Sequence, residues 1–260
     1  MSNPVFFSAA GTLDHLVPGA QFVLQGPEAR HAVAVKRLAP GESVDIADGA
    51  GKRLTGTVVA ASPSELTVEC SALTAEEKPD IRLVLVQALA KGDRDELAVE
   101  TATELGIDAV IPWQSERSIV RWKGERAAKA HAKWQSVATA AAKQARRAWI
   151  PEVRAAVETP GLAAAAAAAD LAIILHEDAV RPFRSVLESW QATADGSRPR
   201  EILLIVGPEG GISPREVTRL CSAGAVTALL GHHVLRSSTA GPAAVVLASD
   251  VLGRWAAPAG

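Results

Sequence analysis

The stretch Leu203-Leu-Ile-Val-Gly-Pro-Glu-Gly-Gly-Ile-Ser-Pro-Arg-Glu216 runs from an apolar segment through a glycine-rich turn into the start of a helix. Its first four residues are all apolar, which is typical of a strand buried on both faces of a parallel sheet. The two adjacent glycines can adopt positive φ values that other residues resist. Ser213 and Glu216 have the spacing of a capping box, and Pro214 suits the first position of a helix. Such a turn presents backbone amides to a ligand.

A second loop of this kind follows in Leu229-Leu-Gly-His-His-Val-Leu-Arg-Ser-Ser-Thr-Ala-Gly241, where an apolar segment again leads through a glycine and a short loop into a helix. Glycine-rich turns can be purely structural connections. Two of them in one domain, however, indicate one shared site. Ser213 could be read as a nucleophile, but its spacing to Glu216 favours a helix cap.

Composition restricts the class of protein. The 260 residues carry a formal net charge of -2, so binding to nucleic acid would depend on local basic patches. No stretch approaches the ~20 apolar residues of a membrane span, and no secretory signal begins the chain. Cys70 and Cys221 are too few for a disulfide scaffold. We therefore expect a soluble, cytoplasmic protein that binds neither a membrane nor a metal ion.

The order of apolar runs and turn signals indicates two domains. Residues 22–70 show short apolar runs separated by turns, with a helical stretch at 27–38, and this predicts a small β-barrel in residues 1–73. The polar segment 74–80 is the expected linker. Within residues 81–260, strands and helices alternate. Strands are expected at 81–88, 108–112, 171–175, 201–206 and 225–230, and helices near 93–105, 124–148, 181–190, 214–223 and 239–254.

This alternation predicts an α/β domain with a parallel sheet covered by helices. The pattern alone favours a doubly wound, Rossmann-like sheet with its ligand at the carboxyl ends of the strands. The chain has neither the Gly-x-Gly-x-x-Gly of a dinucleotide fold nor the Gly-Lys-[Ser/Thr] of a P-loop. Its six histidines form no His-Glu-x-x-His motif, so we expect no metal site.

Taken together, the two loops closely resemble the signature of the SPOUT-class RNA methyltransferases, and specifically the bacterial family that methylates N3 of a uracil in 16S ribosomal RNA. The similarity extends over nearly the whole chain in further segments that occur in the family's order. These are Gln87-Ala-Leu-Ala-Lys-Gly-Asp93, Thr103-Glu-Leu-Gly106, Ser115-Glu-Arg-Ser118, Gln144 to Arg147, and Ile150-Pro151-Glu152.

The resemblance implies an N-terminal PUA-like or OB-like β-barrel that binds RNA, followed by a SPOUT α/β domain with a deep trefoil knot. It implies S-adenosyl-L-methionine as cofactor, and 16S rRNA in the small ribosomal subunit as substrate, at the nucleotide customarily numbered 1498. A homodimer with the cofactor near the subunit interface is also implied. General topology rules make knots rare, so this expectation comes from the resemblance alone.

By the same resemblance, three segments and the helix start after them would hold the cofactor. The expected cofactor-binding residues are Leu175, His176, Glu177, Val206, Gly207, Pro208, Glu209, Gly210, Gly211, Leu230, Gly231, Val234, Leu235, Arg236, Ser238, Thr239 and Ala240. The chain departs from the family at Ser238, where many members have glutamate, and at His232 and His233.

Two residues are candidates for catalysis. Methylation at N3 requires loss of a proton, which leaves an imide anion with charge on two carbonyl oxygens. Arg236 could stabilise that charge, or it could hold the loop or a phosphate. Glu209 is the nearest candidate base, although it could instead bind the cofactor or cap a backbone amide. Precise placement of the reacting groups could supply much of the rate.

Basic residues outnumber acidic ones along the helix expected at 124–148, and neighbouring cations and tryptophans extend this surface. A basic helix can be simply a solvated face. With the neighbouring groups, a surface that contacts RNA phosphates is the better interpretation. The expected RNA-binding residues are Arg30, Lys36, Arg37, Arg117, Arg121, Lys133, Lys143, Arg146 and Arg147.

Two alternatives remain open at this stage. The chain could methylate another RNA position, such as a 2′-hydroxyl or a tRNA base, because the cofactor loops do not select the acceptor. It could also be a non-catalytic RNA-binding assembly factor that keeps the fold.

Overall fold

A computed structural model describes residues 3–193 and 200–256. The chain forms two compact units, one comprising Met1–Lys78 with Ala142–Ile150, the other Pro79–Ala141 with Pro151–Gly260. Residues 1–2, 194–199 and 257–260, which fall within the expected domain ranges, lie outside the described residues.

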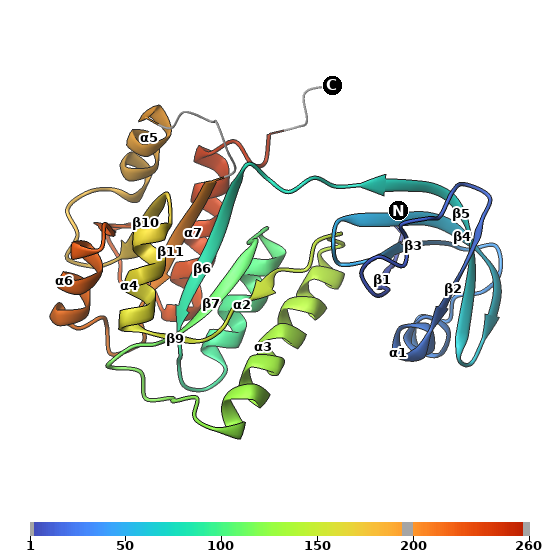
Figure 1. Ribbon diagram of the computed structural model, residues 1–260, viewed down its shortest axis with the longest axis horizontal. Helices are drawn as coiled ribbons and strands as arrows, with labels where there is room; N and C mark the ends of the chain where they lie inside the picture. The colour runs from blue at the N-terminus through green and yellow to red at the C-terminus, as the bar shows by residue number, and fades with distance from the viewer. Residues whose placement is uncertain (1–2, 194–199, 257–260) are drawn as a thin grey trace. The chain divides into compact units, whose positions relative to one another are not determined.

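The first unit is built on a five-stranded sheet in the order β1-β3-β4-β5-β2 (Figure 1). The strands are β1 (Val5–Phe7), β2 (Gln21–Gln25), β3 (Ser43–Ala47), β4 (Lys52–Ser62) and β5 (Glu65–Ala75). No ladder joins β1 to β2 in the described residues, so the sheet is a curled half-barrel that does not close through hydrogen bonds. Its concave side buries Phe6, Ile46 and Leu66. The last two residues of β5 lie inside the segment expected to be a linker.

The helical stretch predicted at 27–38 is present, but it is divided. The short helix α1 (Gly26–Arg30) continues directly into a π-helical turn, η1 (His31–Val35). The sequence carries no signal for this change of helix type. Strand β1 was also not predicted, because three apolar residues form too short a pattern.

Residues 142–150 belong to this first unit although the sequence places them far from the barrel. The Lys143 ammonium donates to Glu28 Oε2 at 2.7 Å, lies 3.0 Å from His31 Nδ1, and sits 4.6 Å above the Phe6 ring. Trp149 Nε1 donates to Glu76 O at 2.8 Å. These contacts fasten the segment to the half-barrel.

The second unit contains a seven-stranded parallel sheet in the order β12-β10-β11-β6-β7-β8, with β9 also paired to β7. Its strands are β6 (Ile81–Ala88), β7 (Ala109–Gln114), β8 (Glu152–Val153), β9 (Val157–Glu158), β10 (Leu171–Leu175), β11 (Arg200–Val206) and β12 (Val226–Ala228). The predicted parallel α/β sheet is confirmed. A Rossmann-like order is not found. With β6, β7 and β8 as its first three strands, such a sheet would place the fourth strand, β10, beside β6, but here β11 lies between them.

Helices cover both faces of this sheet. They are α2 (Arg94–Glu104), α3 (Glu125–Gln144), α4 (Thr159–Ala168), α5 (Phe183–Thr193), α6 (Pro214–Ser222) and α7 (Ser237–Val251). Alternate residues of β6 point to opposite faces: Leu85 packs in the core with α2, α5 and α7, and Val86 packs in the core with α4 and α6. Five of these helices were expected at these places, and the sixth, α4, is rich in alanine, which favours a helix.

Helix α7 packs on β6, which is distant in the sheet from β12, the strand that precedes α7 in the chain. A Cβ added to Gly241 would lie 2.8 Å from Leu85 Cδ1, so α7 packs closely on β6 only because this residue is glycine. Strand β12, which precedes α7 in the chain, lies at the far edge of the sheet beyond β10 and β11. The segment 229–236 therefore crosses the carboxyl ends of β10 and β11.

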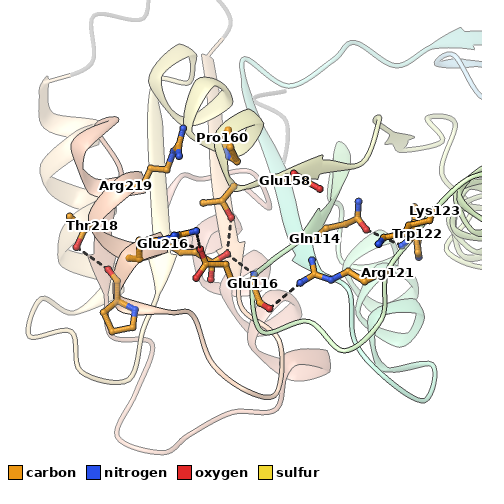
Figure 2. Close-up of a pocket in the computed structure, with 13 residues that line it drawn as sticks. Gln114, Glu116, Arg121, Trp122, Lys123, Glu158, Pro160, Glu216, Thr218 and Arg219 are labelled. Carbon is orange, nitrogen blue, oxygen red and sulfur yellow. Dashed lines mark hydrogen bonds and ion pairs between the residues drawn. The ribbon is translucent and has the colours of Figure 1, made fainter.

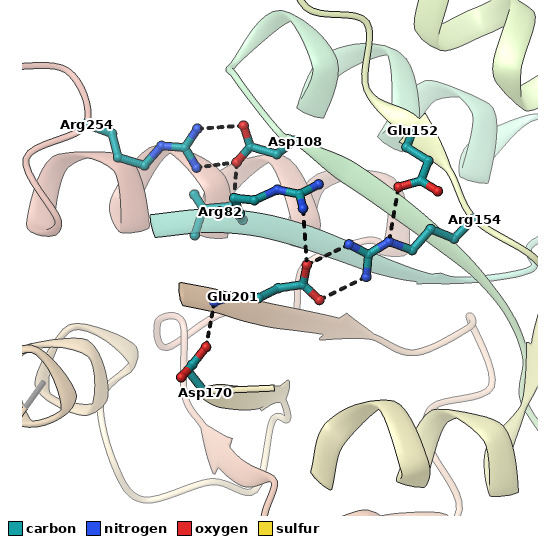
Figure 3. Close-up of polar contacts among 8 residues, drawn as sticks. Arg82, Asp108, Glu152, Arg154, Asp170, Glu201 and Arg254 are labelled. Carbon is teal, nitrogen blue, oxygen red and sulfur yellow. Dashed lines mark hydrogen bonds and ion pairs between the residues drawn. The ribbon is translucent and has the colours of Figure 1, made fainter. Parts of the chain in front are cut away.

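Charged pairs fix the opposite, amino-terminal edge of the sheet (Figure 3). Arg154 makes a bidentate contact with Glu201, with N to O distances of 2.9 and 2.6 Å, and this holds the pKa of the Glu201 carboxyl below its usual value. Arg254 Nη1 donates to Asp108 Oδ2 at 2.7 Å, and Leu83 N donates to the same oxygen at 2.7 Å. Both side chains of the Arg254–Asp108 pair are 11% exposed.

Loss of the Arg254 guanidinium should therefore destabilise the second unit. We expect Arg254→Ala to lower the free energy of unfolding by about 3 kcal/mol, since Asp108 would stay buried without its cation. The matched control is Arg184→Ala, because Arg184 pairs with Asp250 at the exposed surface and should contribute less than about 1 kcal/mol. Urea unfolding followed by tryptophan fluorescence measures both. Equal midpoints for the two variants would contradict the expectation.

Candidate functional site

Four parallel strands end at the same edge of the sheet in the second unit. Register pairs Val206 at the end of β11 with Gln87 of β6, and Leu175 at the end of β10 with Ala228 of β12. The glycine-rich turn at 207–211, the loop that begins at His176 and the crossing segment at 229–236 all start from this edge. The carboxyl edge of a parallel sheet is where α/β proteins bind their ligands.

The turn at 207–211 depends on glycine at two positions. A Cβ on Gly207 would lie 2.6 Å from Ile212 Cγ1, and Gly211 has φ of +71°. Both Gly210 and Gly211 can adopt positive φ, and in the structure Gly211 does so while Gly210 does not. Both Gly210 and Gly211 are exposed, so their backbone is open to a ligand.

The predicted helix cap is confirmed. Ser213 Oγ accepts from Glu216 N at 3.2 Å, and Glu216 Oε2 accepts from Ser213 N at 3.1 Å, with Pro214 at the start of α6. The Ser213 hydroxyl also donates to Glu116 Oε2 at 2.7 Å. These contacts explain Ser213 as a capping residue.

Glu209 joins the glycine-rich turn to the start of α2. Its Oε1 accepts from Arg94 Nη1 at 3.0 Å and from Lys91 N at 3.3 Å. Arg117 fixes the same turn from another direction, because its Nη1 donates to Gly210 O at 3.0 Å. In the structure Glu209 thus accepts from one backbone amide and one guanidinium, and these contacts connect the turn to the start of α2.

Arg236 is the N-cap residue of α7 and is exposed. Its carbonyl oxygen accepts from Thr239 N at 2.8 Å and from Ala240 N at 3.0 Å. In the part of the chain that the structure describes, its guanidinium makes no hydrogen bond or ion pair. The side chain is therefore available to a ligand at this edge.

The remaining predicted cofactor residues occupy the same three connections. His176 N donates to Ala228 O at 3.1 Å, which ties the loop after β10 to β12. Val206 and Pro208 are buried at the turn, and Ser238 and Ala240 are buried in the first turn of α7. The others are half-buried or exposed along the edge: Leu175, His176, Glu177, Leu230, Gly231, Val234, Leu235 and Thr239.

Basic residues expected to contact RNA fall into two groups in the second unit. Arg117 holds the glycine-rich turn, as described, and Lys133 Nζ lies 2.6 Å from Glu96 Oε1, so both have internal partners. Arg121 donates to a backbone oxygen, Glu116 O, at 3.0 Å and stays exposed.

The first unit holds the other predicted RNA contacts. Lys143 is neutralised by Glu28 in the pair described above, which the sequence did not indicate. The others are exposed, except for the half-buried Arg147: Arg30, Lys36, Arg37 and Arg146.

A groove of about 1060 Å³ lies between α4, α6 and the segment after β7 (Figure 2). No sequence motif indicated this groove. The buried Glu216 lies on its floor, where Oε1 accepts from Thr159 Oγ1 at 2.7 Å and from Glu116 N at 2.8 Å. Glu116 is paired with Arg215 at 2.6 Å, and the Ser213 hydroxyl together with Arg215 lowers the pKa of its carboxyl.

None of the helices in the described part of the chain combines the length and apolar character needed to cross a membrane. Across residues 3–193 and 200–256, no group of three or more histidine, cysteine, aspartate or glutamate side chains is arranged to hold a metal ion.

Comparison with known proteins agrees with this architecture. Residues 76–249 match the model of an RNA methyltransferase domain, and residues 24–69 match that of an RNA methyltransferase PUA domain. Ribosomal RNA small subunit methyltransferase E of Mycobacterium tuberculosis is 38% identical over 93% of this chain and 90% of its own length. The chain therefore belongs to the RNA methyltransferase family in which a PUA domain precedes the methyltransferase domain.

Two solved structures are similar over nearly the whole chain. Ribosomal RNA small subunit methyltransferase E from Neisseria gonorrhoeae, bound to S-adenosyl methionine, has a TM-score of 0.79 at 26% identity and covers 96% of this chain and 98% of its own. A putative methyltransferase from Legionella pneumophila, in complex with the bound cofactor, has a TM-score of 0.81 at 25% identity with the same two coverages.

Proposed function

We propose that this protein uses S-adenosyl-L-methionine to methylate N3 of a uracil in 16S rRNA of the small ribosomal subunit, at the nucleotide numbered 1498. The observation that carries the proposal is the glycine-rich turn at the carboxyl edge of the sheet, in a chain that is 38% identical to a small subunit rRNA methyltransferase over 93% of its length. Such a substrate would place the enzyme in the cytoplasm.

The residues at this edge fit the cofactor. Gly210, Gly211 and Gly231 leave the backbone exposed, and a Cβ on Gly231 would meet nothing within 4 Å. Val234 is 78% exposed and could cover an adenine ring, while the Glu177 carboxylate could accept from hydroxyl or ammonium groups. When bound, S-adenosyl-L-methionine supplies an activated methyl group.

The protein's own contribution is to hold the target base and to stabilise its anion. Arg236 is exposed at the N-cap of α7, where the crossing segment ends, so its guanidinium can face the two uracil carbonyl oxygens as N3 loses its proton. Glu209 keeps the turn in place through Arg94 and Lys91. Placement of the acceptor nitrogen in line with the methyl group then lowers the barrier further.

The crossing segment supports the proposal of a trefoil knot. Residues 229–236 leave the edge strand β12, pass the ends of β10 and β11, and enter α7 beside β6. In a knotted domain this segment would lie within a loop of the preceding chain. The proposed knot would hold the cofactor loops against each other without help from a ligand.

A homodimer is the proposed assembly. Leu97 on α2 and Val246 on α7 are large apolar side chains that are 51% and 37% exposed. A second copy would cover these apolar side chains. Light scattering should therefore give twice the mass of the chain, and a monomeric mass at assay concentrations would contradict the dimer.

The proposed RNA surface consists of the predicted basic residues other than Lys133 and Lys143, which pair with acidic side chains, and Arg117, which holds the turn. On the first unit these are Arg30, Lys36, Arg37 and Arg146, with Arg147 half-buried, and on the second unit Arg121. Such cations bind phosphates without reading sequence.

The central test is a map of modified nucleotides in 16S rRNA. We expect mass spectrometry to find one N3-methyluridine that is lost when the gene is deleted and restored by the purified protein with S-adenosyl-L-methionine. Methylation of a 2′-hydroxyl or of tRNA would indicate a related enzyme. RNA binding without methyl incorporation would indicate a non-catalytic assembly factor.

A second test concerns the cofactor turn. Gly207→Ala should weaken binding of S-adenosyl-L-methionine, since the new methyl group would push Ile212 and distort the turn. Gly161→Ala is the matched control, because it adds the same methyl group at an exposed position of α4 outside the candidate cofactor residues, where the nearest atom, Val157 Cβ, is 3.3 Å away. Calorimetric titration compares the two. If both folded variants bind the cofactor like the wild type, the turn does not form the site.

A third test separates catalysis from binding at Arg236. Without its guanidinium the uracil anion loses a stabilising charge, so Arg236→Ala should lower the single-turnover rate by ~100-fold with little change in cofactor or RNA affinity. Arg236→Lys should rescue only in part, because an ammonium cannot form the planar fork. The deficit should narrow as pH rises, since more uracil then ionises unaided. A defect explained wholly by weaker RNA binding would assign Arg236 to phosphate contact.

A further inference from the structure

The groove between α4 and α6, described above, has cations on both of its sides. Figure 2 shows Arg219 on the side of α6, and Arg121 with Lys123 on the segment that follows β7. All three side chains are exposed. The groove walls therefore present positive charge from two elements that are distant in sequence.

The carboxylates within the groove are directed to internal partners. Both oxygens of Glu216 accept from groups of the second unit, and this side chain is 1% exposed. Glu116 is held by the Ser213 hydroxyl and by the Arg215 guanidinium. Glu158 is the remaining acidic side chain of the lining, and it is exposed.

Two of the cations have no competing partner in the protein. Among the described residues, Lys123 and Arg219 make no ion pair or side-chain hydrogen bond. Helix α4 also begins at this groove, with Thr159 and Pro160 in its lining, and no side chain caps its first turn. A helix N-terminus beside free cations favours an anion such as phosphate.

From these observations we infer that the α4–α6 groove binds the sugar–phosphate backbone of the RNA strand that carries the target base. The inference rests on the proposed function for the identity of the RNA. The groove is lined by charged side chains together with the Trp122 ring, and its volume of about 1060 Å³ exceeds that needed for a single small anion.

The groove is connected to the candidate cofactor site through the chain itself. Arg117, in the segment that lines the groove, donates to Gly210 O, and Arg215 and Glu216 belong to the helix that begins after the glycine-rich turn. An RNA strand held in the groove would therefore be placed relative to the turn at which the methyl group is transferred.

The test removes the two free cations together. We expect Lys123→Gln with Arg219→Gln to weaken binding of a 16S rRNA hairpin and to reduce the slope of log affinity against log salt by ~1.4, at ~0.7 for each phosphate contact with a single strand. KM for RNA should rise while kcat at saturating RNA stays unchanged. Fluorescence anisotropy across a KCl series measures the slope, and calorimetry should show unchanged cofactor affinity.

The matched control is Arg181→Gln with Arg184→Gln, which removes the same charge from exposed positions at the start of α5, outside the groove and outside the residues predicted to bind RNA. A wild-type slope in the groove variant would overturn the inference. An equal reduction of the salt slope in both variants would also overturn it. It would show that RNA responds to the overall charge of the unit and not to the groove. If the groove variant differs from the wild type in its mass in solution but not in its salt slope, the groove forms contacts between copies of the chain. If the wild type binds RNA but methylates none, the proposed function fails while the slope still decides the groove.

Discussion

The buried carboxyl group of Glu216 is the interaction on which the functional half of this molecule depends. It is 1% exposed, and its three donors come from three elements: Ser213 N at the cap of α6, Thr159 Oγ1 at the start of α4, and Glu116 N in the segment after β7. A buried carboxyl group without such donors would be strongly destabilising. The same contacts therefore satisfy the group and set the positions of all three elements around the glycine-rich turn.

The two edges of the parallel sheet are stabilised in different ways. At the amino-terminal edge, charged side chains pair directly with one another, as in Arg154–Glu201 and Arg254–Asp108 (Figure 3). At the carboxyl edge, the partners of Glu209 and Arg117 include backbone atoms, and glycines leave the main chain exposed. Rigid pairing at one edge lets the opposite edge keep an open backbone, which is the arrangement that a ligand site requires.

Much of this architecture could be predicted from local sequence. Continuous apolar runs located β6, β10 and β11, and the Ser213–Glu216 spacing identified a true capping box, because these signals act within a few residues. The position of β11 between β6 and β10 could not be predicted from the alternation of strands and helices, since strand order depends on contacts distant in sequence.

The candidate site shows the same division between local and distant contacts. The glycine-rich turn and Arg236 were found through motifs. The partners that fix the turn were not found in this way. Arg94 and Lys91 contact Glu209 across more than a hundred residues, and no sequence periodicity or motif spacing predicts such a contact. Lys143 is a similar case, because its position on a basic helix favoured a solvated or RNA-binding role, whereas Glu28 and the Phe6 ring surround its ammonium in the structure.

The division of the chain into units has a consequence for how this protein can be taken apart. The chain passes between the units after Lys78, after Ala141 and after Ile150. A fragment that ends at the linker would lack residues 142–150, and the half-barrel would lose the apolar cover that Ala142 and Ala148 give to Val5, Phe7 and Ala47. The half-barrel unit is thus not a detachable module. Gene fusion or exchange at the linker alone cannot transfer it intact, so the two units are expected to be inherited together.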